Sequence, residues 1–374
     1  MSLTAQRLGA AFAPPPALLG TATAAGTVVA FAAAEGGFFP SSWRVGSVVL
    51  SAFSCLLLLW TPVRRARATA LLFLPLAAFA ALSLVSVSWS ADPSASLVDV
   101  QRTVLYLVGL AGFALAGEGL VTGVALGAGV VGAWALVERA VTGAHVDPYE
   151  GTLLTGPIGY ANGLGALAAI GLVVCVGLAL QHRRPAYALP LGLFVPVLVL
   201  TGSRAGMLAA VLGCGVAVAL RLRRRVVAAL VVVAASAALT AVLLHPPAFL
   251  GDRAAYWSGA RSTVVAHPFS GSGAGTFGIV HPQAPHARDA HSLYLQVLSE
   301  TGVAGLLLIA AFLAIPLFVA IRSGSVVPAA GLTVFALHAG VDWDWQLPAV
   351  TFAALALAVD AMRKRSVKSD YPLV

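Results

Sequence analysis

Charged residues are scarce in this sequence, and their scarcity excludes most classes of soluble protein. Asp, Glu, Lys and Arg make up 10% of the 374 residues, whereas hydrophobic residues make up 59%. Soluble globular domains carry about 25% charged residues. Because so few charges cannot cover a folded domain in water, we predict an integral membrane protein.

Cysteine is equally scarce, which excludes a disulfide framework. Cys55, Cys175 and Cys214 all lie in apolar segments and form no CxxC motif, so we interpret them as buried thiols. The N-terminal "MSLTAQRLGAAFAPPP" lacks the charged head, apolar core and cleavage site of a secretory signal. We therefore expect the first apolar segment to stay as a membrane anchor. No stripe of basic and aromatic residues indicates a nucleic-acid partner.

Long apolar runs are what the sequence has in abundance. A helix needs about 20 apolar residues to cross a bilayer. We predict an all-α, polytopic fold in which residues 1–374 form a single membrane domain of twelve spans. Their centres lie near residues 26, 52, 77, 109, 130, 170, 194, 212, 235, 310, 333 and 355. The segments 186–202 and 204–220 are expected to form a tight hairpin around "TGSRAG".

Basic residues favour cytoplasmic loops, and they orient the predicted spans. With both termini in the cytoplasm, 15 of the 22 Lys and Arg residues lie inside and 7 outside, whereas 11 of the 14 acidic residues lie outside. The net charge of +8 then mostly reflects loop ends near anionic lipid. Four of the seven outward arginines cluster around the longest outward loop, against the topological rule, which indicates a function there.

That loop spans residues 245–292, between predicted spans nine and ten. Asp252 is a favourable N-cap, and the next proline lies well beyond it, so we predict a short amphipathic helix. Arg253, Trp257 and Arg261 would share one side of this helix. The same pattern is equally typical of a solvated face.

The loop continues with "FSGSGAGTFG", in which glycines recur at positions 271, 273, 275 and 278. Glycines permit close backbone approach and expose N–H groups that can cradle an anion. A merely flexible connector has the same composition. The pattern leaves both interpretations open.

His291 stands at the head of predicted span ten. On a helix it would share one face with Leu295, Leu298 and Gly302, and Gly302 and Gly305 would let a neighbouring helix approach closely. A neutral imidazole in this place can accept a proton. A histidine at a helix end is more often a capping or packing residue.

A metal site must be weighed against this interpretation, because five histidines lie between residues 245 and 291. His281, His286 and His291 recur every five residues, which does not place two ligands on one helical face. No HExxH or CxxC motif accompanies them. We therefore expect no metal and no cofactor.

Other polar residues also have plain structural interpretations. Arg204 lies in a very short outward turn before small residues, although an interfacial anchor is the common fate of such an arginine. Arg288 is typical of loop charge, and Asn162 in "GYANGLG" of a residue that satisfies backbone groups. "GVDWDWQLP", residues 340–348, is typical of an aromatic belt with solvated acids.

The order of these motifs resembles a known family. His291, Ser292, Leu295 and Gly302 resemble the His-[Asn/Ser/Gln]-x-x-Leu-x6-Gly signature of the O-antigen ligase superfamily, which includes O-antigen polymerases and protein O-oligosaccharyltransferases. "TGSRAGMLAAVLG" resembles its Ser-Arg element, and "RAAYWSGARSTVVAHPFSGSGAGTFG" its Arg-x3-Trp helix and glycine-rich turn. The resemblance covers residues 157–305, and Ser292 stands where asparagine is commoner.

The resemblance implies that His291 is the catalytic base and that Arg204 and Arg253 bind the donor's pyrophosphate. The secondary candidates are Arg261, Arg288, Asn162, Ser292 and Trp257. The implied donor is a glycan on undecaprenyl diphosphate at the outer face of the bacterial inner membrane. The implied acceptor is a hydroxyl of lipid A core, of a growing glycan or of another molecule.

Two alternatives stay open. A polymerase of the same superfamily differs from a ligase only in its acceptor, and the motifs do not separate the two. A transporter or flippase for lipid-linked sugars belongs to another class and usually needs ionisable groups deep in its spans. Here the charges gather at the predicted span ends, which favours an enzyme.

Overall fold

The computed structural model describes residues 16–59, 69–144, 146–222, 252–282 and 288–369, and within these ranges the chain is helical without a β-strand. The helices that build the body of the molecule are α2 (Pro16–Ala32), α3 (Pro40–Leu58), α4 (Ala70–Ser86), α5 (Pro93–Ala116), α6 (Leu120–Thr142), α7 (Ala161–His182), α8 (Leu191–Thr201), α9 (Arg204–Leu222), α14 (Leu293–Ser323), α15 (Val326–His338) and α16 (Pro348–Ser369). The predicted all-α fold is confirmed.

The helix boundaries follow local chemistry. Prolines begin α2, α3, α5 and α16, where the missing N–H would have no intrahelical partner. Asp92 caps α5 by accepting from the backbone N–H groups of Ser94 and Ala95. Glycines with positive φ, Gly117 and Gly143, end α5 and α6.

Eleven of the twelve predicted span centres fall inside these helices, and the twelfth, near residue 235, lies outside the described residues. Six of the described helices (α3, α5, α6, α7, α9 and α14) are long and apolar enough to cross a membrane. The 11-residue α8 would reach only about 16 Å at 1.5 Å per residue. The chain is a polytopic α-helical membrane protein, and the number of twelve spans stays a prediction.

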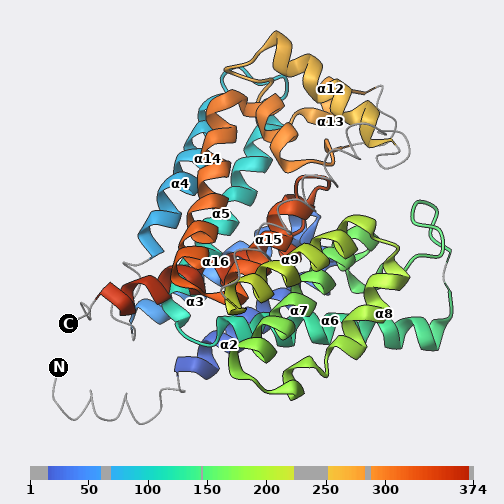
Figure 1. The fold of residues 1–374 in the computed structure, drawn as a ribbon. Coiled ribbons are helices and arrows are strands. Elements are labelled where there is room, and N and C mark those ends of the chain that lie inside the picture. Colours follow the sequence, from blue (N-terminus) through green and yellow to red (C-terminus); the bar gives the residue numbers. More distant parts are fainter. Residues whose placement is uncertain (1–15, 60–68, 145, 223–251, 283–287, 370–374) are drawn as a thin grey trace.

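The helices form two flanks around a central pair (Figure 1). On one flank α4, α5 and α14 lie side by side, and on the other lie α6, α7, α8 and α9. Helices α15 and α16 pack between the flanks, with large buried side chains such as Trp43, Tyr106, Phe113 and Phe352 in the core. The two-residue turn expected before α9 is present, but α8 packs on α6 and α7, whereas α9 packs on α7 and α15.

Two further helices cover one end of the first flank. They are α12 (Arg253–Ala266) and the short α13 (Phe277–Val280), and we name this region the α12 end (Figure 1). A helix is therefore present where the amphipathic helix of the long loop is predicted. The expected cap is wrong, because the Asp252 side chain makes no capping hydrogen bond. Residues 245–251 and 283–287 of the predicted loop lie outside the described part.

Candidate active site

His291 lies just before α14 and not on it. Its φ is +49°, in the left-handed region that residues other than glycine seldom adopt and that often marks functional sites. Helix α14 starts at Leu293, and Ser292 is its N-cap, accepting from the Leu295 N–H at 3.4 Å. The predicted shared face with Leu295 and Gly302 is therefore wrong, because the backbone turns before the helix begins. Ser292 serves as a cap.

One hydrogen bond defines which nitrogen of His291 is basic. Its Nδ1 lies 3.2 Å from the carbonyl oxygen of Asp289. Because a carbonyl only accepts, this bond places the proton on Nδ1 and leaves the lone pair on Nε2. The ring packs at 5.1 Å from the Tyr256 ring and at 6.2 Å, edge-on, from the Trp343 ring. The arrangement holds a proton acceptor in a fixed orientation.

Arg253, the first residue of α12, is tied to the segment between α15 and α16. Its Nε donates to the Val341 carbonyl and its Nη2 to Asp342 Oδ2, both at 2.8 Å. Its side chain is 24% exposed, so this pair is largely shielded from water. Burial disfavours the charge, but the carboxylate of Asp342 outweighs that effect and raises the pKa of Arg253. The guanidinium is a permanent, oriented cation.

Asp342 is the centre of this network. Besides Arg253, it accepts from the Tyr160 hydroxyl at 2.7 Å and from the Trp343 N–H at 2.9 Å, both at Oδ1. Asn162 in turn donates to the Tyr160 hydroxyl at 3.1 Å. Burial raises the pKa of Tyr160 well above its ordinary value, so the phenol stays a donor.

The network reaches His291 through aromatic contacts. The Tyr160 ring packs on Trp343 at 4.4 Å, and Trp343 meets the His291 ring. The Trp257 indole N–H points to the His291 carbonyl at 3.4 Å. The structure thus brings together four of the predicted residues, His291, Arg253, Trp257 and Asn162, at the α12 end.

The other predicted residues are placed apart from this network. Arg204 is exposed at the start of α9, and within the described ranges no hydrogen bond or ion pair joins it to His291 or Arg253. Arg261 is exposed on α12, so the alternative of a solvated face holds for it. Arg288 is exposed too, with its guanidinium over the Phe38 ring at 5.8 Å.

Side-chain contacts nevertheless link the start of α9 to residues 340–348, the segment that carries Asp342. Ser203, the residue before Arg204, lies 3.4 Å from His338 Nε2, and His338 Nδ1 lies 2.7 Å from Asp344. Asp342 and Asp344 are both fully buried. The interpretation of residues 340–348 as a belt with solvated acids is therefore wrong. Two acids close together in so acid-poor a chain, Asp342 and Asp344, are the signal that could have revealed the network.

The glycine-rich segment is neither a flexible connector nor an open anion cradle. Its N–H groups at Gly275 and Phe277 donate to the carboxylate of Glu300, at 2.9 and 3.0 Å, and the Gly273 N–H donates to the Glu300 carbonyl at 2.8 Å. Glu300 is buried in α14. The group that these amides hold is the protein's own carboxyl side chain, so the segment is a docked structural element.

Gly302 also has a different role from the one predicted. Its φ of 68° interrupts α14, and a Cβ there would lie 2.1 Å from the carbonyl oxygen of Phe269. Close approach at Gly302 therefore serves the loop and not a neighbouring helix. A Cβ on Gly305 would meet Thr301 of the same helix at 1.8 Å.

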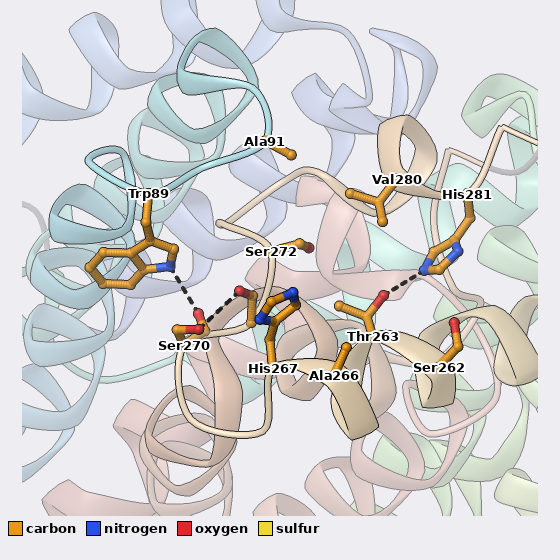
Figure 2. Close-up of a pocket in the computed structure, with 11 residues that line it drawn as sticks. Trp89, Ala91, Ser262, Thr263, Ala266, His267, Ser270, Ser272, Val280 and His281 are labelled. Atoms are coloured by element: carbon orange, nitrogen blue, oxygen red, sulfur yellow. Dashed lines mark hydrogen bonds between the residues drawn. The ribbon is translucent and has the colours of Figure 1, made fainter.

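A separate polar cavity of about 810 Å³ lies beside α12 (Figure 2). Figure 2 shows Trp89 donating to the Ser270 carbonyl at 3.1 Å and His281 facing the Thr263 hydroxyl at 2.9 Å. Burial lowers the pKa of His281. None of the network residues around His291 lines this cavity. Across the part of the chain that the structure describes, no three His, Cys, Asp or Glu residues group as metal ligands.

Comparison with known proteins agrees with the motifs. Residues 189–310 match the family model described as O-antigen ligase. This part of the chain is similar to O-antigen ligases. The match spans α8, α9, α12, α13 and the first part of α14, and so includes Arg204, Arg253 and His291. A search of curated proteins gave no match. The resemblance to the O-antigen ligase superfamily, whose members are membrane glycosyltransferases, is confirmed.

Proposed function

We propose that this protein transfers a glycan from undecaprenyl diphosphate to an acceptor hydroxyl at the outer face of the bacterial inner membrane. The observation that carries the proposal is the joint ordering of His291 and Arg253 by one network of contacts at the α12 end. The family match supports the class of reaction. The identity of the donor, the side of the membrane that the site faces and the roles of the residues are our inference.

Arg253 is suited to hold the donor's diphosphate. Its Nε and Nη2 are anchored on the protein, while Nη1 has no protein partner among the described residues. A guanidinium bound in this way presents its remaining N–H groups to phosphate oxygens at a fixed angle. Arg204 would supply the second cation, from the start of α9.

His291 would act as the base through Nε2. The proton of the acceptor hydroxyl passes to Nε2 as the hydroxyl oxygen forms a bond to the anomeric carbon from the face opposite the diphosphate. The bond from that carbon to the diphosphate breaks, and its electron pair leaves with undecaprenyl diphosphate. The configuration is inverted. The arginines stabilise the growing charge, so no metal is required.

A lipid-linked sugar transporter is the second candidate from another class. Such a transporter usually needs an ionisable group within the spans that can gain and lose a proton. Glu300 is a buried acid in α14, but two loop amides and Gln296 hold its carboxylate. The contact pattern favours a structural role for this acid, and hence the enzyme.

Turnover of a purified lipid-linked donor in EDTA tests the mechanism. We expect His291→Ala to reduce transfer at least 100-fold, about 2.7 kcal/mol of barrier. His267→Ala is the matched control, because His267 is an exposed histidine of the same loop outside the network. Normal transfer by His291→Ala would remove the base, and dependence on an added divalent ion would remove the metal-free step.

Arg253→Lys tests the guanidinium separately from its charge. A lysine cannot donate to Val341 and Asp342 while also presenting a fork to phosphate, so we expect about a 100-fold loss in kcat/KM. Arg139→Lys is the control, since among the described residues Arg139 donates only to the Thr152 carbonyl, at 3.0 Å. An unchanged rate for Arg253→Lys would show that this residue contributes only its positive charge.

A further inference from the structure

A second cavity reaches Asp289, two residues before His291, and is not explained by donor binding. It has a volume of about 940 Å³ and lies between the start of α3, the first turns of α5, the α13 region and residues 288–296. Pockets of about 300–1,000 Å³ hold ligands of drug size. The space is therefore sufficient for a short oligosaccharide.

Charged and amide groups line its inner wall. Asp99 and Arg102 form an ion pair on α5, and the amide of Gln296 donates to Asp289 at 3.0 Å. Asp99, Asp289 and Gln296 are buried, and Arg288 lies exposed at the edge. Carboxylate, amide and guanidinium groups together offer paired donors and acceptors, which matches the vicinal hydroxyls of a sugar.

Aromatic rings complete the lining. Trp43 is buried in the wall, whereas Phe39 is 43% and Tyr149 85% exposed. The C–H faces of a pyranose ring stack on such rings, while its hydroxyls need the polar wall. A lipid tail would not use the four polar side chains, and a phosphate would not use the aromatic rings. Their combination is typical of a saccharide site.

The position of the cavity points to the acceptor. Arg288 and Asp289 lie three and two residues before His291, and the carbonyl of Asp289 is the one that orients the imidazole. Arg204 and Arg253, the groups assigned to the donor's diphosphate, are absent from its lining. In an inverting transfer the acceptor oxygen approaches from the face opposite the diphosphate, so base and acceptor belong on the same side.

We propose that this cavity is the subsite for the acceptor's saccharide, with Phe39 and Tyr149 as its stacking platform and Asp99, Arg102 and Asp289 as its hydroxyl-binding wall. The statement that the bound saccharide belongs to the acceptor rests on the proposed function. Saccharide binding itself follows from the lining. The proposal predicts that the acceptor carries a glycan, and it excludes acceptors that have none.

Binding is tested first, without turnover. Saturation-transfer NMR is recorded on the purified protein with methyl glycosides of glucose, galactose, mannose and heptose. We expect a signal from at least one glycoside with the wild type and its loss in Phe39→Ala/Tyr149→Ala. Phe269→Ala is the matched control, because Phe269 is an 81% exposed aromatic residue that does not line the cavity. Absence of any wild-type signal, or a signal unchanged in the double variant, overturns the subsite.

Turnover then identifies which glycan occupies it. The glycoside with the strongest signal serves as soluble acceptor for the purified lipid-linked donor. We expect the double variant to raise the KM for the glycoside about tenfold and leave the donor KM unchanged. A raised donor KM instead assigns the cavity to the donor's glycan and overturns the acceptor. Binding without any donor turnover by the wild type would end the proposed function and leave the saccharide site standing.

Discussion

Replacing Asp342 by asparagine removes one charge from the centre of the site with almost no change in shape. The carboxylate accepts from three donors, Arg253 at Oδ2 and the Tyr160 hydroxyl and Trp343 N–H at Oδ1. An asparagine has one oxygen and one NH2 group. If the NH2 faces Arg253, two donors oppose each other; if it faces Trp343, the backbone N–H there loses its acceptor.

Either orientation leaves a buried donor unsatisfied, because Asp342 is fully buried. An unsatisfied buried donor costs about 1–3 kcal/mol. We expect the free energy of unfolding of Asp342→Asn to fall by that amount. Arg253 loses its charged partner and keeps its bond to the Val341 carbonyl, and a displacement of about 1 Å of a positioning group can reduce the rate about 100-fold. We therefore expect kcat/KM for the lipid-linked donor to fall by about 10- to 100-fold.

The assay combines thermal unfolding in detergent with donor turnover. Asp252→Asn is the matched control, since Asp252 precedes Arg253, is exposed and makes no capping hydrogen bond. This substitution makes the same change in charge, and we expect the free energy of unfolding to fall by less than about 0.5 kcal/mol, with no loss of rate. Equal effects of the two substitutions would refute the assignment of Asp342 as the residue that positions Arg253.

Three further outcomes are expected. Glu300→Gln replaces one acceptor oxygen by a donor that faces loop amides, so we expect a loss of about 1–3 kcal/mol and faster cleavage of the loop in limited proteolysis; unchanged cleavage would contradict the docked loop. Gly302→Ala should prevent folding or strongly lower the melting temperature, because its Cβ would overlap the Phe269 carbonyl. Gly324→Ala is the control, because Gly324 has a similar φ of 70° but an added Cβ would have nothing within 4 Å, so it should cost far less stability. Equal melting temperatures of the two variants would refute the contact. Because burial lowers the pKa of His281 from its ordinary 6.5, stability is full above about pH 6.5 and falls as the pH drops and the unfolded chain binds the proton; His281→Gln should flatten that dependence of the melting temperature between pH 7 and 5, and an unchanged slope would contradict it.

Much of the site could be predicted because certain residue types are restricted to certain places. Arginine on the predicted outward side of a membrane protein opposes a general bias, so Arg253 was conspicuous in the sequence. His291 was conspicuous as a polar residue at the edge of a long apolar run. Both lie in the network that the structure shows. Arg204 has the same sequence signal, and its role stays a prediction.

The partners of these residues could not be predicted. Asp342 is 89 residues away from Arg253 in the chain, and Tyr160 is 182 residues from Asp342. No local pattern specifies which acid meets which arginine across such separations. The periodicity around His291 also misled, because periodicity describes helices, and His291 lies in a left-handed turn just before one.

Composition and apolar run length by themselves determined the all-helical membrane class, the approximate positions of the helices and the helix in the long loop. These properties depend on the free energy of placing each residue in lipid or water and on local capping, which are encoded within about 20 neighbouring residues. Tertiary structure alone decided that the glycine segment is held by Glu300, that Asp342 is buried against Arg253, and that a cavity lies beside His291. Such pairings depend on which helix ends meet in space, and a buried charge takes the partner that the packing brings to it.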